Sequence, residues 1–167
     1  GSAQRWRKIR RFFREGSAKE QEEEDYIAPV VLACMNMARK KTGALIAIQG
    51  TSDLTPYQHA GERFLAAVNA RLIETIFFKN SPLHDGAMII AGGKICAAGC
   101  ILPVASDTDL NKDLGLRHRS ALGLSQKTDA KVIIISEERG TISLAYRSEI
   151  IVDITPDELR ALLASED

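Results

Sequence analysis

The sequence lacks the features that mark a secreted or a membrane-spanning protein. It has only three cysteines, an odd number without the spacing of a disulfide framework, which indicates a reducing, cytoplasmic environment. It has no run of about 18 consecutive apolar residues, so we expect no membrane span within it. Its formal net charge is zero, so no overall field recruits nucleic acid, and we expect no nucleic-acid partner. Any anion must then be bound by a local cluster of basic residues.

The sequence also lacks the short motifs of several common enzyme classes. It contains no G-x-x-x-x-G-K-[ST] loop, no G-x-G-x-x-G loop, no H-E-x-x-H helix and no G-x-S-x-G elbow. These absences argue against conventional ATPases, dehydrogenases and hydrolases. What is present is a chain of 167 residues with 45% apolar and 26% charged side chains, enough for one soluble globular domain.

The N-terminal segment differs in composition from the rest of the chain. Gly1-Ser2, with no initiating methionine, is typical of the scar left by a removed purification tag, so we expect a piece cut from a longer protein. Residues 3–14 carry six basic residues and no acid, and residues 20–25 carry five acids. The segment is either a solvated, flexible arm or a juxtamembrane segment whose cations and aromatic rings face anionic lipid.

Helical signals begin immediately after this segment. Apolar residues recur at helical spacing from Ile27 to Met37, and Gly43 ends that run. Asn69 is placed to cap a second helix that ends before Pro82. Thr155 begins a Thr-Pro-Asp-Glu capping box, with proline at the first helical position, so we expect a last helix running to about Leu163.

Short apolar runs between these helices predict strands. Gly92-Gly93 is a two-residue hairpin turn between two of them. Cys96 and Cys100 lie four apart in one predicted strand, too far for one zinc ion, and are interpreted as core cysteines. The expected strands are 44–48, 87–91, 94–102, 132–136 and 141–146, with loops at 49–60 and 105–114. Together these elements predict a single α/β (or α+β) domain with a central mixed sheet of about six or seven strands flanked by helices.

The triplet Arg117-His118-Arg119 is the first candidate site. Two guanidinium groups around an imidazole are costly to bury, so the triplet lies either on the surface or around an anion. Gly115 permits a tight turn before a helix, and a helix N-terminus with arginines beside it suits a phosphate. The alternative is a solvated basic helix start.

Two acidic motifs form the second candidate site. His84-Asp85-Gly86 stands at the mouth of a predicted strand, where a carboxylate can bind a divalent cation and the glycine lets a ligand approach the backbone. Ser136-Glu137-Glu138 follows another predicted strand and offers further carboxylates. Either motif alone is equally compatible with an ordinary turn.

The three motifs together resemble a known family. PLHDGA (82–87), G-x-RHR (115–119) and SEE (136–138), in this order and at these spacings, resemble the bacterial diadenylate cyclase domain, and specifically its membrane-anchored subclass. The resemblance runs from about Tyr26 to Leu163. It implies that residues 1–25 are a juxtamembrane arm, that 26–167 are the catalytic domain, and that a cytoplasmic domain is tethered to the cell membrane by helices upstream.

The resemblance also implies an activity. Members of the family condense two ATP molecules into cyclic di-AMP, a second messenger, and release two pyrophosphates. They use a divalent metal (Mn²⁺, Mg²⁺ or Co²⁺), act as face-to-face homodimers and are regulated by partner proteins. The roles implied here are catalysis by Asp85, Arg117, His118 and Arg119; ATP binding by Gly86, Ala87, Leu102, Gly115, Arg117, His118, Arg119, Ser136 and Glu137; and metal binding by His84, Asp85 and Glu138.

Three positions depart from the family's usual pattern. Leu116 stands where a threonine precedes RHR, Ile101 where an aromatic residue precedes the pocket leucine, and Leu65 where an aspartate is common. These departures support one rival interpretation, a catalytically silent nucleotide-binding or sensor module of the same fold. The other rivals are an interaction domain that uses RHR as a surface patch, and a metal-dependent phosphoester hydrolase.

Overall fold

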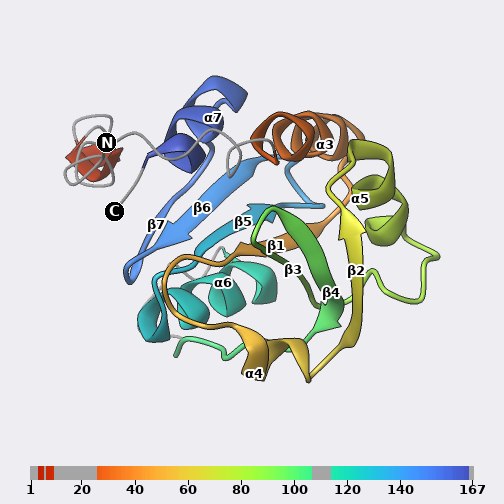
Figure 1. Ribbon diagram of the computed structural model, residues 1–167. Helices are drawn as coiled ribbons and strands as arrows, with labels where there is room; N and C mark the ends of the chain where they lie inside the picture. Colours follow the sequence, from red (N-terminus) through yellow and green to blue (C-terminus); the bar gives the residue numbers. More distant parts are fainter. Residues whose placement is uncertain (1–3, 6, 10–25, 107–113, 166–167) are drawn as a thin grey trace.

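A seven-stranded mixed sheet forms the centre of the protein, with helices on both faces (Figure 1). The computed structural model describes residues 4–5, 7–9, 26–106 and 114–165. The strand order is β2-β4-β3-β1-β5-β6-β7. The strands are β1 (Ala44–Ile48), β2 (Glu62–Ala67), β3 (Ala87–Ala91), β4 (Lys94–Cys100), β5 (Lys131–Ile135), β6 (Ile142–Tyr146) and β7 (Glu149–Ile151).

Strand β1 lies in the middle of the sheet and pairs in parallel with β3, whereas the other neighbouring strands pair antiparallel. The β3–β4 ladder is interrupted twice, between Ala87 and Ile89 and between Ile89 and Ile90. The first interruption faces Gly99, whose φ of 66° is the left-handed conformation that glycine adopts without a Cβ clash. Such bulges bend the strand and increase its local twist.

The helices begin and end where local signals in the sequence place them. The Asn69 side chain accepts a hydrogen bond from Leu72 N–H, and Thr155 and Glu158 form the reciprocal capping box. The helices are α3 (Ile27–Lys40), the one-turn α4 (Thr55–Gln58), α5 (Ala70–Phe77), α6 (Leu116–Lys127) and α7 (Pro156–Ala164).

The two sheet faces carry separate cores. Helices α3, α5 and α7 cover one face and bury the larger cluster, which includes Phe77 and Leu162. Helix α6 and the α4 loop cover the other face over the smaller cluster, which includes Leu102 and Leu124. Both clusters take alternate residues of the central strands, because successive strand side chains point to opposite faces.

Lys131 ties the last helix to the sheet. This buried lysine at the start of β5 donates from Nζ to the carbonyl oxygens of Leu162 (2.7 Å) and Ser165 (2.5 Å). These carbonyls belong to the end of α7, where no further turn of helix follows to satisfy them. The carbonyl oxygens at the C-terminus of α7, together with the negative end of its dipole, offset the free-energy cost of burying the Lys131 ammonium group.

The predicted fold class is confirmed, and the differences lie at the sheet edges. Strands β2 and β7 were not expected, and the loop at 49–60 contains the short helix α4. Of the two predicted core cysteines, Cys100 is buried, whereas Cys96 is only partly buried; Cys34, in α3, is also buried, and all three are free thiols. Most of the predicted loop at 105–114 lies outside the described residues.

Part of the N-terminal arm contacts the domain. Arg5 donates to the backbone oxygen of Asp153 (2.9 Å), and Lys8 donates to that of Ile150 (3.1 Å). Ile9 is buried in the larger core cluster. Among the described residues, no helix has both the length and the apolar character required to cross a bilayer. The remainder of the predicted arm lies outside the described residues.

Candidate active site

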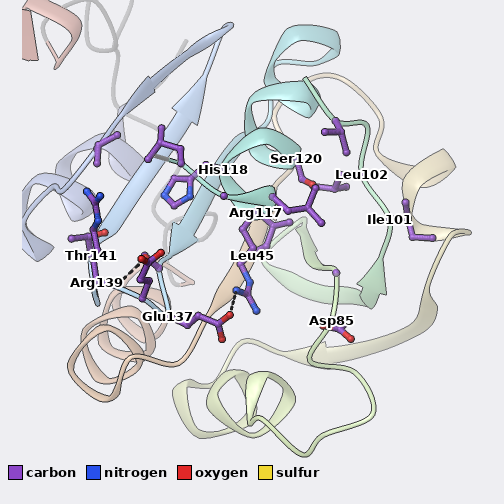
Figure 2. A pocket seen from close by; sticks show the side chains of 18 of the residues that line it. Leu45, Asp85, Ile101, Leu102, Arg117, His118, Ser120, Glu137, Arg139 and Thr141 are labelled. Carbon is purple, nitrogen blue, oxygen red and sulfur yellow. Dashed lines mark hydrogen bonds and ion pairs between the residues drawn. The ribbon is translucent and has the colours of Figure 1, made fainter. Parts of the chain in front are cut away.

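A cavity of about 600 Å³ opens on the α6 face of the sheet (Figure 2). Its lining comes mainly from the turn before β3, the chain that follows β4, the N-terminus of α6 and the hairpin between β5 and β6, with Leu45 of β1 and Val152 after β7. Its size is that of a small-molecule or cofactor site. All three sequence motifs contribute to the lining, so the topology brings together residues far apart along the chain.

The turn before β3 presents Asp85 to solvent. His84 is held through Nδ1, 2.8 Å from the carbonyl oxygen of Ser81, and the Ser81 Oγ accepts from Leu83 N–H (3.1 Å). Gly86 has a φ of 89°, and a Cβ there would lie 2.7 Å from the carbonyl oxygen of Cys100. Only glycine therefore fits, and the Asp85 side chain, 88% exposed, is free to contact a ligand.

The N-terminus of α6 supplies the basic residues. Gly115 precedes the helix and provides no side-chain cap, so the first N–H groups of α6 remain available to an anion. Arg117 packs over Gly43, where a Cβ would overlap its guanidinium group. Its Nη1 lies 3.4 Å from Oε1 of Glu137 (Figure 2). An alanine at position 43 would displace that guanidinium.

His118 is the buried member of the triplet. Its Nε2 has no hydrogen-bond partner among the described residues, although the ring lines the cavity. Burial lowers the pKa of His118 below its ordinary value, and the positive charges of Arg117 and Arg139 lower it further. The imidazole is therefore mainly neutral at pH 7, and its buried Nε2 has no hydrogen-bond partner within the described residues.

The β5–β6 hairpin forms a rigid acidic rim. The Ser136 carbonyl accepts from Gly140 N–H (2.8 Å), and its side-chain oxygen accepts from Arg139 N–H (3.1 Å). Gly140 has a φ of 68° and packs against the carbonyl oxygen of Ala38 at the end of α3. These contacts fix the hairpin, so Glu137, Glu138 and Arg139 project from a defined backbone.

An apolar wall faces the charged residues. Cys100, Ile101, Leu102 and Val104 line it along the chain that leaves β4. Ile101 is 74% exposed, so an apolar ring at this wall would bury it. Burial raises the pKa of the Cys100 thiol to about 11, which keeps it protonated and unreactive at neutral pH.

The apolar wall is attached to α6. Ala105 N–H donates to the carbonyl oxygen of Arg119 (3.0 Å). A Cβ at Gly123 would collide with the carbonyl group of Pro103, so this glycine allows helix and loop backbones to touch. The wall and the basic helix start are therefore one rigid unit.

The structure brings most of the predicted site residues into this cavity. Those that line it are Asp85, Gly86, Leu102, Gly115, Arg117, His118, Ser136, Glu137 and Glu138. Three do not: His84 lies behind Asp85, Ala87 is buried beneath the site, and the half-buried Arg119 supports the wall through its backbone. The lining residues that sequence reasoning missed include Leu45, Val104, Ser120, Arg139, Thr141 and Val152.

The missed residues differ in whether the sequence carried a signal for them. Arg139 directly follows the SEE motif, so inspection of its neighbours could have found it. Leu45 and Val152 appear as ordinary apolar residues, and only the strand order places them at the cavity.

The acidic residues offer hard oxygen ligands for a cation. Asp85, Glu137 and Glu138 all line the cavity. Within the described ranges no three His, Cys, Asp or Glu side chains converge closely enough to form a complete metal site. Mg²⁺ and Mn²⁺ characteristically take one or two carboxylates and complete their shell with water and substrate phosphates. These carboxylates therefore fit a metal ion whose remaining ligands are water and the phosphates of a bound substrate.

Residues 31–150 match the sequence profile of the DAC family, described as the DisA bacterial checkpoint controller nucleotide-binding domain. The chain is 39% identical over 155 residues to a diadenylate cyclase of Listeria monocytogenes, covering 93% of this chain and 57% of the relative. It therefore spans somewhat more than half the length of that curated relative.

Solved structures agree with the sequence match. The crystal structure of a double mutant of DacA from Staphylococcus aureus superposes with a TM-score of 0.83 at 39% identity, covering 87% of this chain and 97% of that one. A hypothetical membrane spanning protein from Bacillus cereus gives a TM-score of 0.75 at 34% identity, covering 78% and 64%. Since the profile, the relative and the structures agree, the chain belongs to the DAC family of nucleotide-binding domains.

Proposed function

We propose that this domain is a diadenylate cyclase, which joins two ATP molecules into cyclic di-AMP and releases two pyrophosphates. The observation that carries the proposal is one cavity with an apolar wall, a basic helix start and an exposed carboxylate, contributed by segments that lie far apart along the chain. One nucleotide would contact both sides of the cavity, with its adenine against Leu102 in the apolar wall and its phosphates near Arg117 at the N-terminus of α6. Membership of the DAC family and the name of the Listeria relative support the same activity.

The proposed chemistry needs positioning and charge neutralisation rather than a covalent intermediate. The 3′-oxygen of one ATP attacks the α-phosphorus of the other, and its proton passes to the Asp85 carboxylate. The bond from the α-phosphorus to the oxygen bridging to the β-phosphate breaks, and pyrophosphate leaves. Arg117 and the α6 N–H groups stabilise the charge on the phosphate oxygens. The 3′-oxygen of the second ATP then attacks the α-phosphorus of the first in the same way, which closes the ring and releases the second pyrophosphate.

In this proposal a divalent metal would be held mainly by Asp85 and Glu138, with His84 beside them. Nδ1 of His84 lies 2.8 Å from the carbonyl oxygen of Ser81, and its Nε2 lies 3.3 Å from Oδ1 of Asp85, so the imidazole stands directly beside the carboxylate that would take the metal. Mn²⁺, Mg²⁺ or Co²⁺ would supply charge neutralisation at the phosphates and acidify the attacking hydroxyl.

Two copies of the chain are required in this proposal. A cavity of about 600 Å³ accommodates one nucleotide, so a second ATP must come from a second domain facing the first. Exposed apolar side chains at the cavity mouth, Ile101, Val104 and Leu116, suit contact with such a partner. We further propose attachment of the whole protein to the cell membrane, supported by the description of the Bacillus cereus structure and by the basic arm.

The decisive experiment is to incubate the domain with ATP and each of Mn²⁺, Mg²⁺ and Co²⁺, and to identify products by chromatography and mass. We expect cyclic di-AMP with at least one metal, and a loss of about 10³-fold in Asp85→Asn because the general base is removed. Specific activity should rise with protein concentration if two copies form the site. AMP or ADP as the main product would point instead to hydrolysis.

A silent sensor module is the second candidate. Leu116, 61% exposed, lines the cavity where it offers no hydroxyl to a phosphate, and Ile101 offers no aromatic ring to a base. The same incubation separates the two functions. ATP binding without product under every metal would establish the sensor and reject the cyclase.

A further inference from the structure

Arg139 is a basic residue of the cavity that lies outside the three motifs. It follows Glu138 in the β5–β6 hairpin and lines the same cavity as Arg117 and His118. Figure 2 shows it at the hairpin, on the side of the cavity away from Ile101 and Leu102. A nucleotide whose base lies against the apolar wall at Leu102 would therefore extend its phosphates toward Arg139.

Arg139 differs from Arg117 in its availability. Arg117 is engaged, with Glu137 at 3.4 Å and Gly43 beneath it. In the part of the chain that the structure describes, the Arg139 guanidinium forms no ion pair. Its charge nevertheless reaches the interior of the site, because it contributes to lowering the pKa of His118. Within residues 4–5, 7–9, 26–106 and 114–165, Arg139 is thus a positive charge near His118 with no acidic residue paired to it.

The backbone beneath Arg139 is fixed. Its N–H donates to Ser136 Oγ (3.1 Å), and the adjacent Gly140 bonds back to the Ser136 carbonyl (2.8 Å) while packing on Ala38. A guanidinium anchored in this way loses less conformational freedom when it binds a phosphate than one on a mobile loop.

The charge balance of the cavity requires a second cation. Three carboxylates, those of Asp85, Glu137 and Glu138, line it together with two guanidinium groups. Without Arg139, three negative groups would face one positive group that is already paired. A triphosphate entering such a site would meet an excess of carboxylates, whereas Arg139, which forms no ion pair with any described residue, offers it a forked, charge-assisted donor.

We propose that Arg139 binds the β- and γ-phosphates of ATP and so makes the cavity selective for a triphosphate over a monophosphate. This proposal rests on the proposed function for the identity of the nucleotide. Arg117 and the α6 N-terminus hold the α-phosphate region, and Arg139 holds the part that leaves as pyrophosphate. Arg139 is in this sense a substrate-binding residue with little part in the bond-making step.

Calorimetry on the folded domain with two probes tests the proposal. The first probe is an ATP analogue with a methylene bridge between its α- and β-phosphates, which cannot release pyrophosphate, and the second is AMP, which lacks both outer phosphates. Arg139→Gln should weaken binding of the analogue by about 10- to 100-fold and leave AMP binding within about twofold. Arg139→Lys should recover part of the loss because it keeps the charge but not the fork.

Arg160→Gln is the matched control, since it removes one exposed arginine of α7 away from the cavity, and it should change neither affinity. Unaltered analogue binding in Arg139→Gln overturns the proposal, as does an equal loss for AMP. If the wild type binds the analogue but makes no cyclic di-AMP from ATP, the proposed cyclase function is wrong. The role of Arg139 is still decided by comparing how much Arg139→Gln weakens binding of the analogue and binding of AMP. In an active enzyme, the KM for ATP should rise more than kcat falls.

Discussion

The two faces of the sheet are covered in different ways. On one face, three helices, α3, α5 and α7, pack over the larger cluster of buried apolar residues. On the other, α6 is the main helix, and the rest of that face meets the α4 loop, the chain after β4 and the cavity. The first face buries the larger apolar cluster, whereas on the second the Ala105–Arg119 hydrogen bond and the Gly123–Pro103 contact attach the cavity wall to α6.

We expect the helix-covered face to determine mainly the stability of the protein and the α6 face to determine mainly its activity. The central strands β1, β3 and β5 contribute side chains to both clusters, so the helix-covered face holds the platform from which the site residues project. The α6 face leaves its polar groups near the cavity available to a ligand, as functional sites require, at the expense of apolar contact. Substitutions on the two faces should therefore produce different phenotypes.

The largest effect on stability is expected from Phe77→Ala on the helix-covered face. Phe77 is 1% exposed at the end of α5, and its removal leaves a cavity in the larger cluster. We expect the free energy of unfolding to fall by about 3–5 kcal/mol. Urea denaturation followed by circular dichroism measures it.

The neighbouring Phe78, 58% exposed, provides the control, because Phe78→Ala removes the same ring from a solvated position. Its effect should stay within about 1 kcal/mol. Nucleotide affinity of Phe77→Ala, measured well below its melting temperature, should match the wild type. An affinity loss in the folded variant would contradict the division between the two faces.

The next effect concerns activity alone and comes from Gly43→Ala. The added Cβ overlaps the Arg117 guanidinium and must displace it from Glu137. Since the backbone at position 43 is not left-handed, alanine is tolerated there and the melting temperature should hold or rise slightly. We expect kcat/KM to fall by about 10- to 100-fold, the cost of one misplaced charged donor.

A double-mutant cycle shows whether this loss passes through Arg117. In an Arg117→Ala background, Gly43→Ala should cost nothing more, because the side chain that it displaces is already gone. Additive losses would mean that the glycine acts on another part of the site. In that case the packing of Arg117 over Gly43 would have no functional role.

The smallest effect is a pH dependence on the α6 face. Burial acts to raise the pKa of Asp129, but hydrogen bonds from Thr51 and Ser52 outweigh it and lower the pKa to about 2. A carboxyl whose pKa is depressed on folding stabilises the protein above its ordinary value of 3.8, and that stabilisation is lost as pH falls toward 2. Asp129→Asn should flatten the decline of melting temperature between these two values.

Thermal melts at several pH values in this range measure the slope. The control is Asp157→Asn, which removes an exposed carboxylate in the first turn of α7, on the helix-covered face. It should leave the slope close to that of the wild type. An Asp129→Asn variant whose acid sensitivity equals that of the wild type would show that the Thr51–Ser52 loop is not held by this carboxylate.

Much of the fold follows from local signals in the sequence. The Asn69 cap, the Thr155 capping box and the Gly92-Gly93 turn each satisfy backbone groups within a few residues, so their positions were predicted correctly. Strand β2 escaped prediction because it is an edge strand with exposed side chains and an irregular register against β4. Its pairing depends on a strand about thirty residues away, which no local pattern reveals.

The site was predictable in its motifs but not in its assembly. Asp85, Arg117 and Glu138 were candidates because their three motifs together resemble the diadenylate cyclase domain, and all three line the cavity. The sequence could not identify Leu45 or Val152 as lining residues, since an apolar residue in a strand looks the same beneath a cavity as beneath a helix. Nor could it show that Arg119 supports the wall through its backbone instead of lining the cavity.

The attachment of the apolar wall to α6 has a consequence for ligand choice. The Ala105–Arg119 hydrogen bond and the Gly123–Pro103 contact fix the distance between Leu102 and the N-terminus of the helix. The cavity therefore selects ligands by the distance between their ring and their anionic group. A ligand contacts the apolar wall and the helix N-terminus at once only when this distance matches the fixed separation. A ring without phosphates, or phosphates without a ring, can occupy only one end at a time.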